Sequence, residues 1–223
     1  DGVSASYCTY QNDARPNPNP NRINLMLKEF QLGFLKSGAP FDSVFLKDLP
    51  LVNLDQYNLV VFLNTYHMTD AQRRFIRHDV ADAGRVVVWS YAPGLFNGSV
   101  QSVAAMADLT GISIAAGEDR FCEPMSVLLP EGTDYLGLSE PVSFGLKGDI
   151  ARLFYVDDTE ARPLAHWAGG DQITMAVKSL DDWTSVYVLA AVMPPEMVQA
   201  LAKRAGVHIY NQPGDMLQVN ASY

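Results

Sequence analysis

The segment from Leu59 to Gly94 constrains the fold more than any other part of this 223-residue chain. Val60 to Leu63 and Val86 to Trp89 are short, continuous apolar runs, which are typical of strands buried on both faces. Between them, Thr69 and Gln72 have the spacing of a capping box, and a helical apolar pattern follows that ends at a glycine. The segment therefore predicts a βαβ unit, and with it a parallel sheet that carries helices on both faces.

Ligands of such sheets bind in the loops that follow the carboxyl ends of the strands. Here those loops are residues 64–68 and 90–94, and both contain aromatic and amide side chains. Such side chains suit sugar rings, which combine apolar faces with hydroxyl groups. The predicted ligand-binding residues are Asn64, Tyr66, His67 and Tyr91. The alternative is that Trp89 belongs to the core and that the two tyrosines only pack the loops together.

The alternation of strand and helix patterns extends over most of the chain and is interrupted once. Residues 1–118 and 171–223 alternate strand and helix patterns, beginning with a strand at Val3 to Tyr10 and a helix over residues 23–36. Between residues 119 and 170, short extended pieces alternate with turn residues and no helical period is evident, which indicates a β-rich insertion. The predicted fold class is a three-layer α/β/α domain with a mostly parallel sheet and this insertion. Further short strands are predicted at Ser43 to Leu46 and Val207 to Tyr210.

Composition and charge argue against several functions. A net charge of −9 does not suit nucleic acid or an anionic membrane as a partner. The densest basic stretch, Arg73, Arg74 and Arg77, is interpreted as the solvated face of a helix. No apolar run approaches the roughly 20 residues that cross a bilayer. The glycines do not form a phosphate-binding loop, and the four histidines are scattered, so no cofactor and no metal site is predicted.

The sequence also gives little support for a catalytic serine or cysteine nucleophile. Ser90 follows a buried strand but lacks the flanking glycines of a nucleophile elbow. Cys122 is interpreted as a buried thiol, although a disulfide with Cys8 remains an alternative. The chain begins at Asp1 and ends at Tyr223, and we expect it to be a piece of a longer polypeptide. Localisation in the bacterial cytoplasm, in the periplasm or outside the cell stays open.

Three runs carry a family resemblance: VVFLNTYHMTDAQRRFI, VVVWSYAPG and AKRAGVHIYNQPGDMLQVNASY. They resemble the middle, trimerisation domain of family 42 β-galactosidase-like glycoside hydrolases over about residues 44–223. The resemblance implies a flavodoxin-like fold related to class I glutamine amidotransferases. It also implies that the catalytic carboxylates lie on a separate TIM barrel. The amidotransferase cysteine would align near Ser90 and Tyr91, and neither is cysteine, so no catalytic residue is carried over.

The leading hypothesis is a non-catalytic accessory or oligomerisation domain of a β-galactosidase-like glycoside hydrolase. Its expected partners are further copies of itself and a catalytic barrel in the same polypeptide. A carbohydrate is the expected ligand, bound at a sugar site to which the strand-end loops contribute. The alternatives are a stand-alone hydrolase with a strand-end site, and a carbohydrate-binding or sensory module.

Overall fold

The computed structural model describes residues 32–63, 65–98, 100–117, 122–147, 152–189 and 192–216. The predicted first strand and most of the helix over residues 23–36 lie outside these ranges. The helical segments are η1 (Leu46–Leu51), η2 (Leu54–Gln56), α3 (Asp70–Phe75) with its π-helical continuation η3 (Ile76–Val80), α4 (Val103–Thr110), α5 (Pro130–Leu136) and α6 (Pro195–Arg204). The strands are β1 (Leu59–Phe62), β2 (Val86–Ser90), β3 (Phe96–Asn97), β4 (Val100–Gln101), β5 (Ile114–Ala116), β6 (Met125–Leu128), β7 (Ser143–Gly145), β8 (Phe154–Val156), β9 (Arg162–Trp167), β10 (Ile173–Ser179) and β11 (Thr184–Val188).

The predicted βαβ unit is confirmed. β1 and β2 pair in parallel, and α3 with η3 connects them. Thr69 and Gln72 form the capping box, each side chain bonding to the other residue's backbone. After the helix the chain turns through Gly84, whose φ of 73° is left-handed.

The main sheet is mixed and mostly antiparallel, which corrects the prediction of a mostly parallel sheet. Its path runs β1-β2-β11-β10-β9-β6-β7, and β8 joins β10 to β5. Among the described strands of this sheet, parallel pairing is confined to β1 with β2 and β2 with β11. Residues 168–172 and 180–183 connect β9, β10 and β11, and loops this short allow only antiparallel pairing. Parallel strands need a crossover of about a dozen residues or more.

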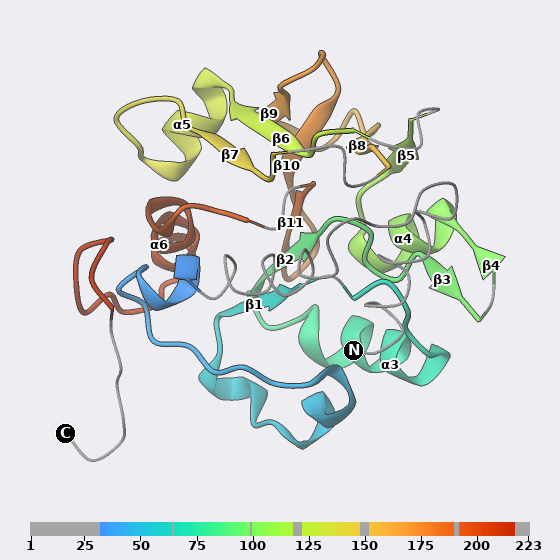
Figure 1. The fold of residues 1–223 in the computed structure, drawn as a ribbon. Helices are drawn as coiled ribbons and strands as arrows, with labels where there is room; N and C mark the ends of the chain where they lie inside the picture. The colour runs from blue at the N-terminus through green and yellow to red at the C-terminus, as the bar shows by residue number, and fades with distance from the viewer. Residues whose placement is uncertain are drawn as a thin grey trace, which may run out of the picture.

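The strands of the predicted β-rich stretch join this same sheet. β9 pairs with β10, and β6 pairs with both β9 and β7, so the sheet continues without a break (Figure 1). α5 lies in this stretch, which corrects the expectation that it holds no helix. The apolar period of a seven-residue helix is too short to detect, but its proline at the first turn was a usable signal.

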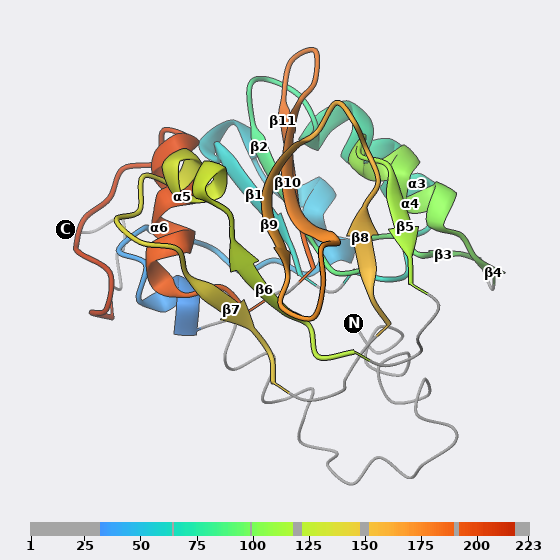
Figure 2. The ribbon, with the colours of Figure 1, turned by 90° about the horizontal axis from the view of Figure 1, so that it is seen from above.

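Helices lie against both faces of the sheet. α3 and α4 lie on one side, and α5 and α6 lie on the other (Figure 2). The buried apolar residues form two core clusters, and alternate residues of β2 belong to different ones. Val87 and Trp89 belong to the first cluster, whereas Val86 and Val88 belong to the second. β2 is therefore buried on both faces, as its continuous apolar run predicted. In β1 only Phe62 is buried, and Leu59, Val60 and Val61 are partly exposed, which corrects the same prediction for that strand.

Two predicted strands are not strands in the structure. Ser43 to Phe45 is exposed, irregular chain that leads into η1 at Leu46. Val207 donates its amide to the carbonyl of Ala202, so it closes the end of α6 instead of joining the sheet. In both cases a mainly apolar stretch of four residues was too short to distinguish a strand from a helix boundary.

Candidate ligand site at the strand ends

The structure brings the two predicted strand-end loops together. Phe62 lies opposite Trp89 in the parallel ladder, so β1 and β2 end side by side. Backbone hydrogen bonds also join the two loops beyond the strands. The amide of Gly94 donates to the carbonyl oxygen of Thr65 over 2.8 Å, and the amide of Phe96 donates to that of Tyr66 over 2.9 Å. The carboxyl ends of the two strands thus share one structured corner.

Tyr66 and Tyr91 form the centre of this corner as packed aromatic side chains. Their rings meet edge to face with centroids 5.5 Å apart, and Tyr91 makes a similar contact with Phe154 at 5.3 Å. Tyr66 is 1% exposed and Tyr91 is 7% exposed. Each ring therefore contributes apolar burial and edge-to-face attraction to the core.

Tyr91 has an unusual backbone conformation. Its φ of 62° is left-handed, which few non-glycine residues adopt. Its amide donates to the carbonyl of Val188, and its own carbonyl accepts from the hydroxyl of Tyr187. Backbone strain of this kind persists only where the surroundings hold it, and here β11 supplies both contacts.

The remaining candidates are less buried or undescribed. His67 is partly exposed and forms an isolated parallel bridge with Phe96. Asn64 lies outside the described residues. Ligand binding by Asn64, Tyr66, His67 and Tyr91 stays a prediction, and His67 is the described candidate that a ligand can reach without rearrangement of the corner.

Ser90 and Trp89 are core residues. Trp89 is fully buried, stacks on Phe62 with centroids 4.8 Å apart, and donates its indole N–H to Ser185. Ser90 is also fully buried, and its hydroxyl has no hydrogen-bond partner among the described groups. A serine sealed in this way is not presented to a substrate.

Arg73 is the residue of this corner that sequence analysis missed. It is 5% exposed, which corrects its assignment to a solvated helix face. Its guanidinium donates to the carbonyls of Ala105, Gly94 and Phe96, so it ties the loop after β2 to α4. Burial lowers the pKa of the Arg73 guanidinium.

Helical spacing was the available signal for Arg73. Arg73 lies three residues before Ile76 and seven before Val80, on the same face as these two buried side chains. Gly94 completes the arrangement, because its φ is 62° and an added Cβ would lie 2.9 Å from the Arg73 guanidinium. The loop after β2 is thus shaped to receive the arginine.

Asp158 and Cys122 have structural surroundings in the described part of the chain. Asp158 accepts from the amide of Glu160, the side-chain bond of a turn, and forms an ion pair with Lys178. Cys122 is buried, whereas Cys8 lies outside the described residues. Within the described ranges no three His, Cys, Asp or Glu side chains gather as metal ligands, and no helix is long and apolar enough to cross a membrane.

Comparison with known proteins gives matches at the level of structure. No protein-family model and no curated protein matches the sequence. A β-galactosidase from Bacillus circulans sp. alkalophilus matches with a TM-score of 0.61 and 16% identity, over 86% of this chain and 28% of that one. A catalytic mutant of Gan42B, a GH42 β-galactosidase from G. stearothermophilus, matches with a TM-score of 0.58 and 12% identity, over 86% and 27%.

The fold matches a portion of GH42 β-galactosidases. That portion is little more than a quarter of their length, consistent with the middle, trimerisation domain that the sequence resembles. An exo-β-1,4-mannosidase, Op5Man5 from Opitutaceae bacterium strain TAV5, also matches, with a TM-score of 0.51 and 15% identity over 84% of this chain and 30% of that one. Proteins named for different sugars share this fold, so the fold alone does not specify a sugar.

Proposed function

We propose that this chain is a non-catalytic accessory and oligomerisation domain of a β-galactosidase-like glycoside hydrolase. Its catalytic barrel would belong to the same polypeptide. The observation that carries the proposal is the structural match, which covers 86% of this chain but only 27–28% of the β-galactosidases. A chain that corresponds to one part of a larger hydrolase is expected to support chemistry performed elsewhere in it.

The closed strand-end corner supports the non-catalytic part of the proposal. Ser90 is fully buried, and Tyr66 and Tyr91 fill the space where an open α/β site would accept a ligand. The two terminal nitrogens of the Arg73 guanidinium donate to backbone carbonyls, and these bonds hold the loop after β2 in place. These contacts stabilise a surface and present no nucleophile to a substrate.

Two exposed apolar side chains near η1 support the oligomerisation part. Phe45 is 73% exposed and directly precedes η1, and Leu51 is 85% exposed and is the last residue of η1. Large apolar side chains exposed close together mark a contact surface more often than isolated ones do. We therefore assign the self-association surface to the η1 segment.

Light scattering on the purified chain tests this assignment. We expect a mass above that of the 24.5 kDa monomer, and a lower mass for the double variant Phe45→Ser/Leu51→Ser. Val100→Ser is the matched control, because Val100 is 66% exposed but lies on β4. A monomeric wild type at all concentrations, or equal masses for the double variant and wild type, would contradict the oligomerisation role.

Activity assays separate the proposal from the stand-alone hydrolase. We expect no hydrolysis of aryl-galactosides by the purified chain. Turnover that is lost in His67→Ala would instead support an enzyme with a strand-end site. The full-length coding sequence gives a second check, because a gene that encodes only this domain would contradict the expected catalytic barrel in the same polypeptide.

The partial exposure of His67 favours a contribution of the strand-end loops to a sugar site. Titration of the chain with galactose, followed by the NMR shifts of the histidine side chains, measures this directly. We expect the His67 signal to move and that of His78, an exposed histidine on η3, to stay. Sugar binding that is unchanged in His67→Ala would place the ligand elsewhere and favour a separate carbohydrate-binding surface.

A further inference from the structure

Two arginine side chains lie over the ring of Tyr135, on the side of the sheet that carries α5 and α6 (Figure 2). The guanidinium carbon of Arg204 lies 3.8 Å from the ring centroid, and that of Arg162 lies 5.6 Å from it. Tyr135 belongs to α5, Arg204 is the last residue of α6, and Arg162 is the first residue of β9. We call these three side chains the Arg–Tyr–Arg cluster.

The side chains of the Arg–Tyr–Arg cluster are held in place. The ring of Tyr135 is partly buried and packs against the second core cluster, which anchors it. Arg204 donates its Nε–H to the carbonyl of Tyr135, and Arg162 donates from Nη2 to the carbonyl of Glu131 over 3.1 Å. A guanidinium that stacks on a ring and bonds to a backbone carbonyl loses little further freedom when it binds a ligand.

Neither arginine of the cluster is paired with a carboxylate among the described residues. The described ion pairs instead involve Arg77, Arg85 and Lys178. Glu131 and Asp134 are exposed on α5, yet neither forms an ion pair with the two arginines. Each guanidinium uses one nitrogen for its carbonyl bond, so further N–H donors remain open to solvent.

The cluster concentrates positive charge in a chain whose net charge is −9. Both guanidinium groups lie over one ring, so their like charges repel each other. Carboxylates bound to them would offset this repulsion and accept hydrogen bonds from the open N–H donors. The net negative charge of the chain disfavours an acidic partner elsewhere on the surface, and this makes the cluster selective.

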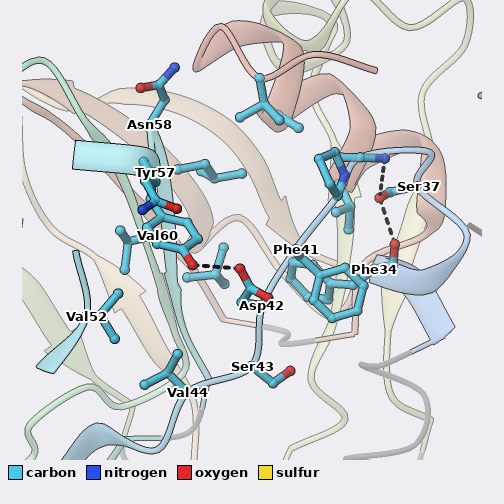
Figure 3. A pocket seen from close by; sticks show the side chains of 18 of the residues that line it. Phe34, Ser37, Phe41, Asp42, Ser43, Val44, Val52, Tyr57, Asn58 and Val60 are labelled. Carbon is cyan, nitrogen blue, oxygen red and sulfur yellow. Dashed lines mark hydrogen bonds between the residues drawn. The ribbon is translucent and has the colours of Figure 1, made fainter. Parts of the chain in front are cut away.

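The groove between β1 and residues 40–44 does not offer a comparable site (Figure 3). Its lining is largely apolar, and the acidic side chain in it is Asp42. The hydroxyl of Tyr57 donates to the carboxylate of Asp42 over 2.6 Å, as the dashed line shows. A carboxylate-bearing partner would therefore meet a negative charge in the groove, but two positive charges at the Arg–Tyr–Arg cluster.

We propose that the Arg–Tyr–Arg cluster is a docking surface for an acidic polypeptide segment of a partner protein. Arginine and tyrosine are enriched among the residues that carry most of the binding energy of protein interfaces. The two arginines are exposed, whereas sites for small ligands are concave and enclose most of the ligand. Glutamate and aspartate side chains of the segment accept hydrogen bonds from the open guanidinium donors. This inference does not depend on the proposed function.

Fluorescence anisotropy with a fluorescein-labelled hexaglutamate peptide tests the proposal on the whole purified chain. We expect saturable binding that weakens as salt is added, and none for hexaglutamine with the same label. Arg162→Gln and Arg204→Gln should each weaken binding about tenfold or more. Arg74→Gln is the matched control, because Arg74 is an exposed arginine on α3 without an ion pair among the described residues. It removes the same charge and should weaken binding less than about twofold.

Three outcomes overturn the proposal. No saturable binding of hexaglutamate to the wild-type chain would mean that the cluster docks no acidic segment. Equal weakening in Arg74→Gln and in the two cluster variants would mean general attraction to surface charge without a site. Displacement of the peptide by inorganic phosphate at the peptide's own binding concentration would assign the cluster to a free oxyanion. The first and third are measured on the wild-type chain, so they remain decisive if a cluster variant does not fold.

Discussion

The hydroxyl of Tyr187 donates a hydrogen bond to the carbonyl oxygen of Tyr91 over 2.6 Å. Tyr187 is fully buried in β11, and Tyr91 is the left-handed residue that directly follows β2. Burial raises the pKa of Tyr187 well above its ordinary value, so the hydroxyl remains a donor at neutral and mildly alkaline pH. The contact links two parallel strands at the corner where the candidate site lies.

Removing this hydroxyl should destabilise the fold. Tyr187→Phe leaves the buried carbonyl of Tyr91 without its donor, and we expect the free energy of unfolding to fall by about 1–3 kcal/mol in urea titrations. Tyr210→Phe is the control, because Tyr210 is 55% exposed, and should change it by less than about 0.5 kcal/mol. Equal stabilities for the two variants would show that the hydrogen bond does not hold the corner.

Replacing Arg73 by lysine should destabilise the fold, whereas replacing Arg74 by lysine should not. A lysine cannot reproduce the planar fork that reaches the carbonyls of Ala105, Gly94 and Phe96. We expect Arg73→Lys to lower the unfolding free energy by roughly 2–4 kcal/mol, since buried acceptors lose their donors. Arg74→Lys, at an exposed position one residue on, should stay within about 0.5 kcal/mol. Thermal and urea unfolding measure both, and a tolerant Arg73 would argue that the loop after β2 is held by other contacts.

The turn between η3 and β2 offers a stabilising substitution. Ala83 is exposed with a φ of 57°, which costs a residue with a Cβ about 1 kcal/mol. Ala83→Gly removes that cost but makes the unfolded chain more flexible, so we expect a net gain of about 0.5 kcal/mol. Gly84→Ala should lose about 1 kcal/mol through conformation alone, because nothing lies within 4 Å of an added Cβ. Melting temperatures that shift in the same direction would refute this account of the turn.

Asp158 should make stability depend on pH. Burial alone would raise the pKa of this carboxyl, but the amide of Ser113 and the ammonium of Lys178 outweigh it, and the pKa is lowered. A lowered pKa means that the stabilisation is present above the unfolded value of about 3.9 and is lost as pH falls through the folded value. We expect Asp158→Asn to lose about 2 kcal/mol at neutral pH and little in strong acid. Urea titrations at the two pH values measure this, and Asp157→Asn, at the exposed neighbouring position, should change the unfolding free energy at neutral pH by less than about 0.5 kcal/mol.

Local patterns identified the βαβ unit because its signals act over a few residues. The capping box of Thr69 and Gln72 and the left-handed turn at Gly84 depend on hydrogen bonds and sterics within one turn of chain. The resemblance to family 42 β-galactosidases likewise rested on runs of adjacent residues, and the match in fold agrees with it.

Strand direction and burial were decided by tertiary structure. The apolar run of β10 is compatible with either direction, and the short loop to β11 makes their pairing antiparallel. Arg73 looked like a solvated cation, yet the carbonyls that bind it come from Gly94, Phe96 and Ala105, more than twenty residues away. The sequence by itself determined the βαβ unit, with its capped helix and the glycine turn that follows it, because those preferences are local. Only the folded chain decided which strands meet and which polar groups are sealed inside, because these depend on contacts between distant residues.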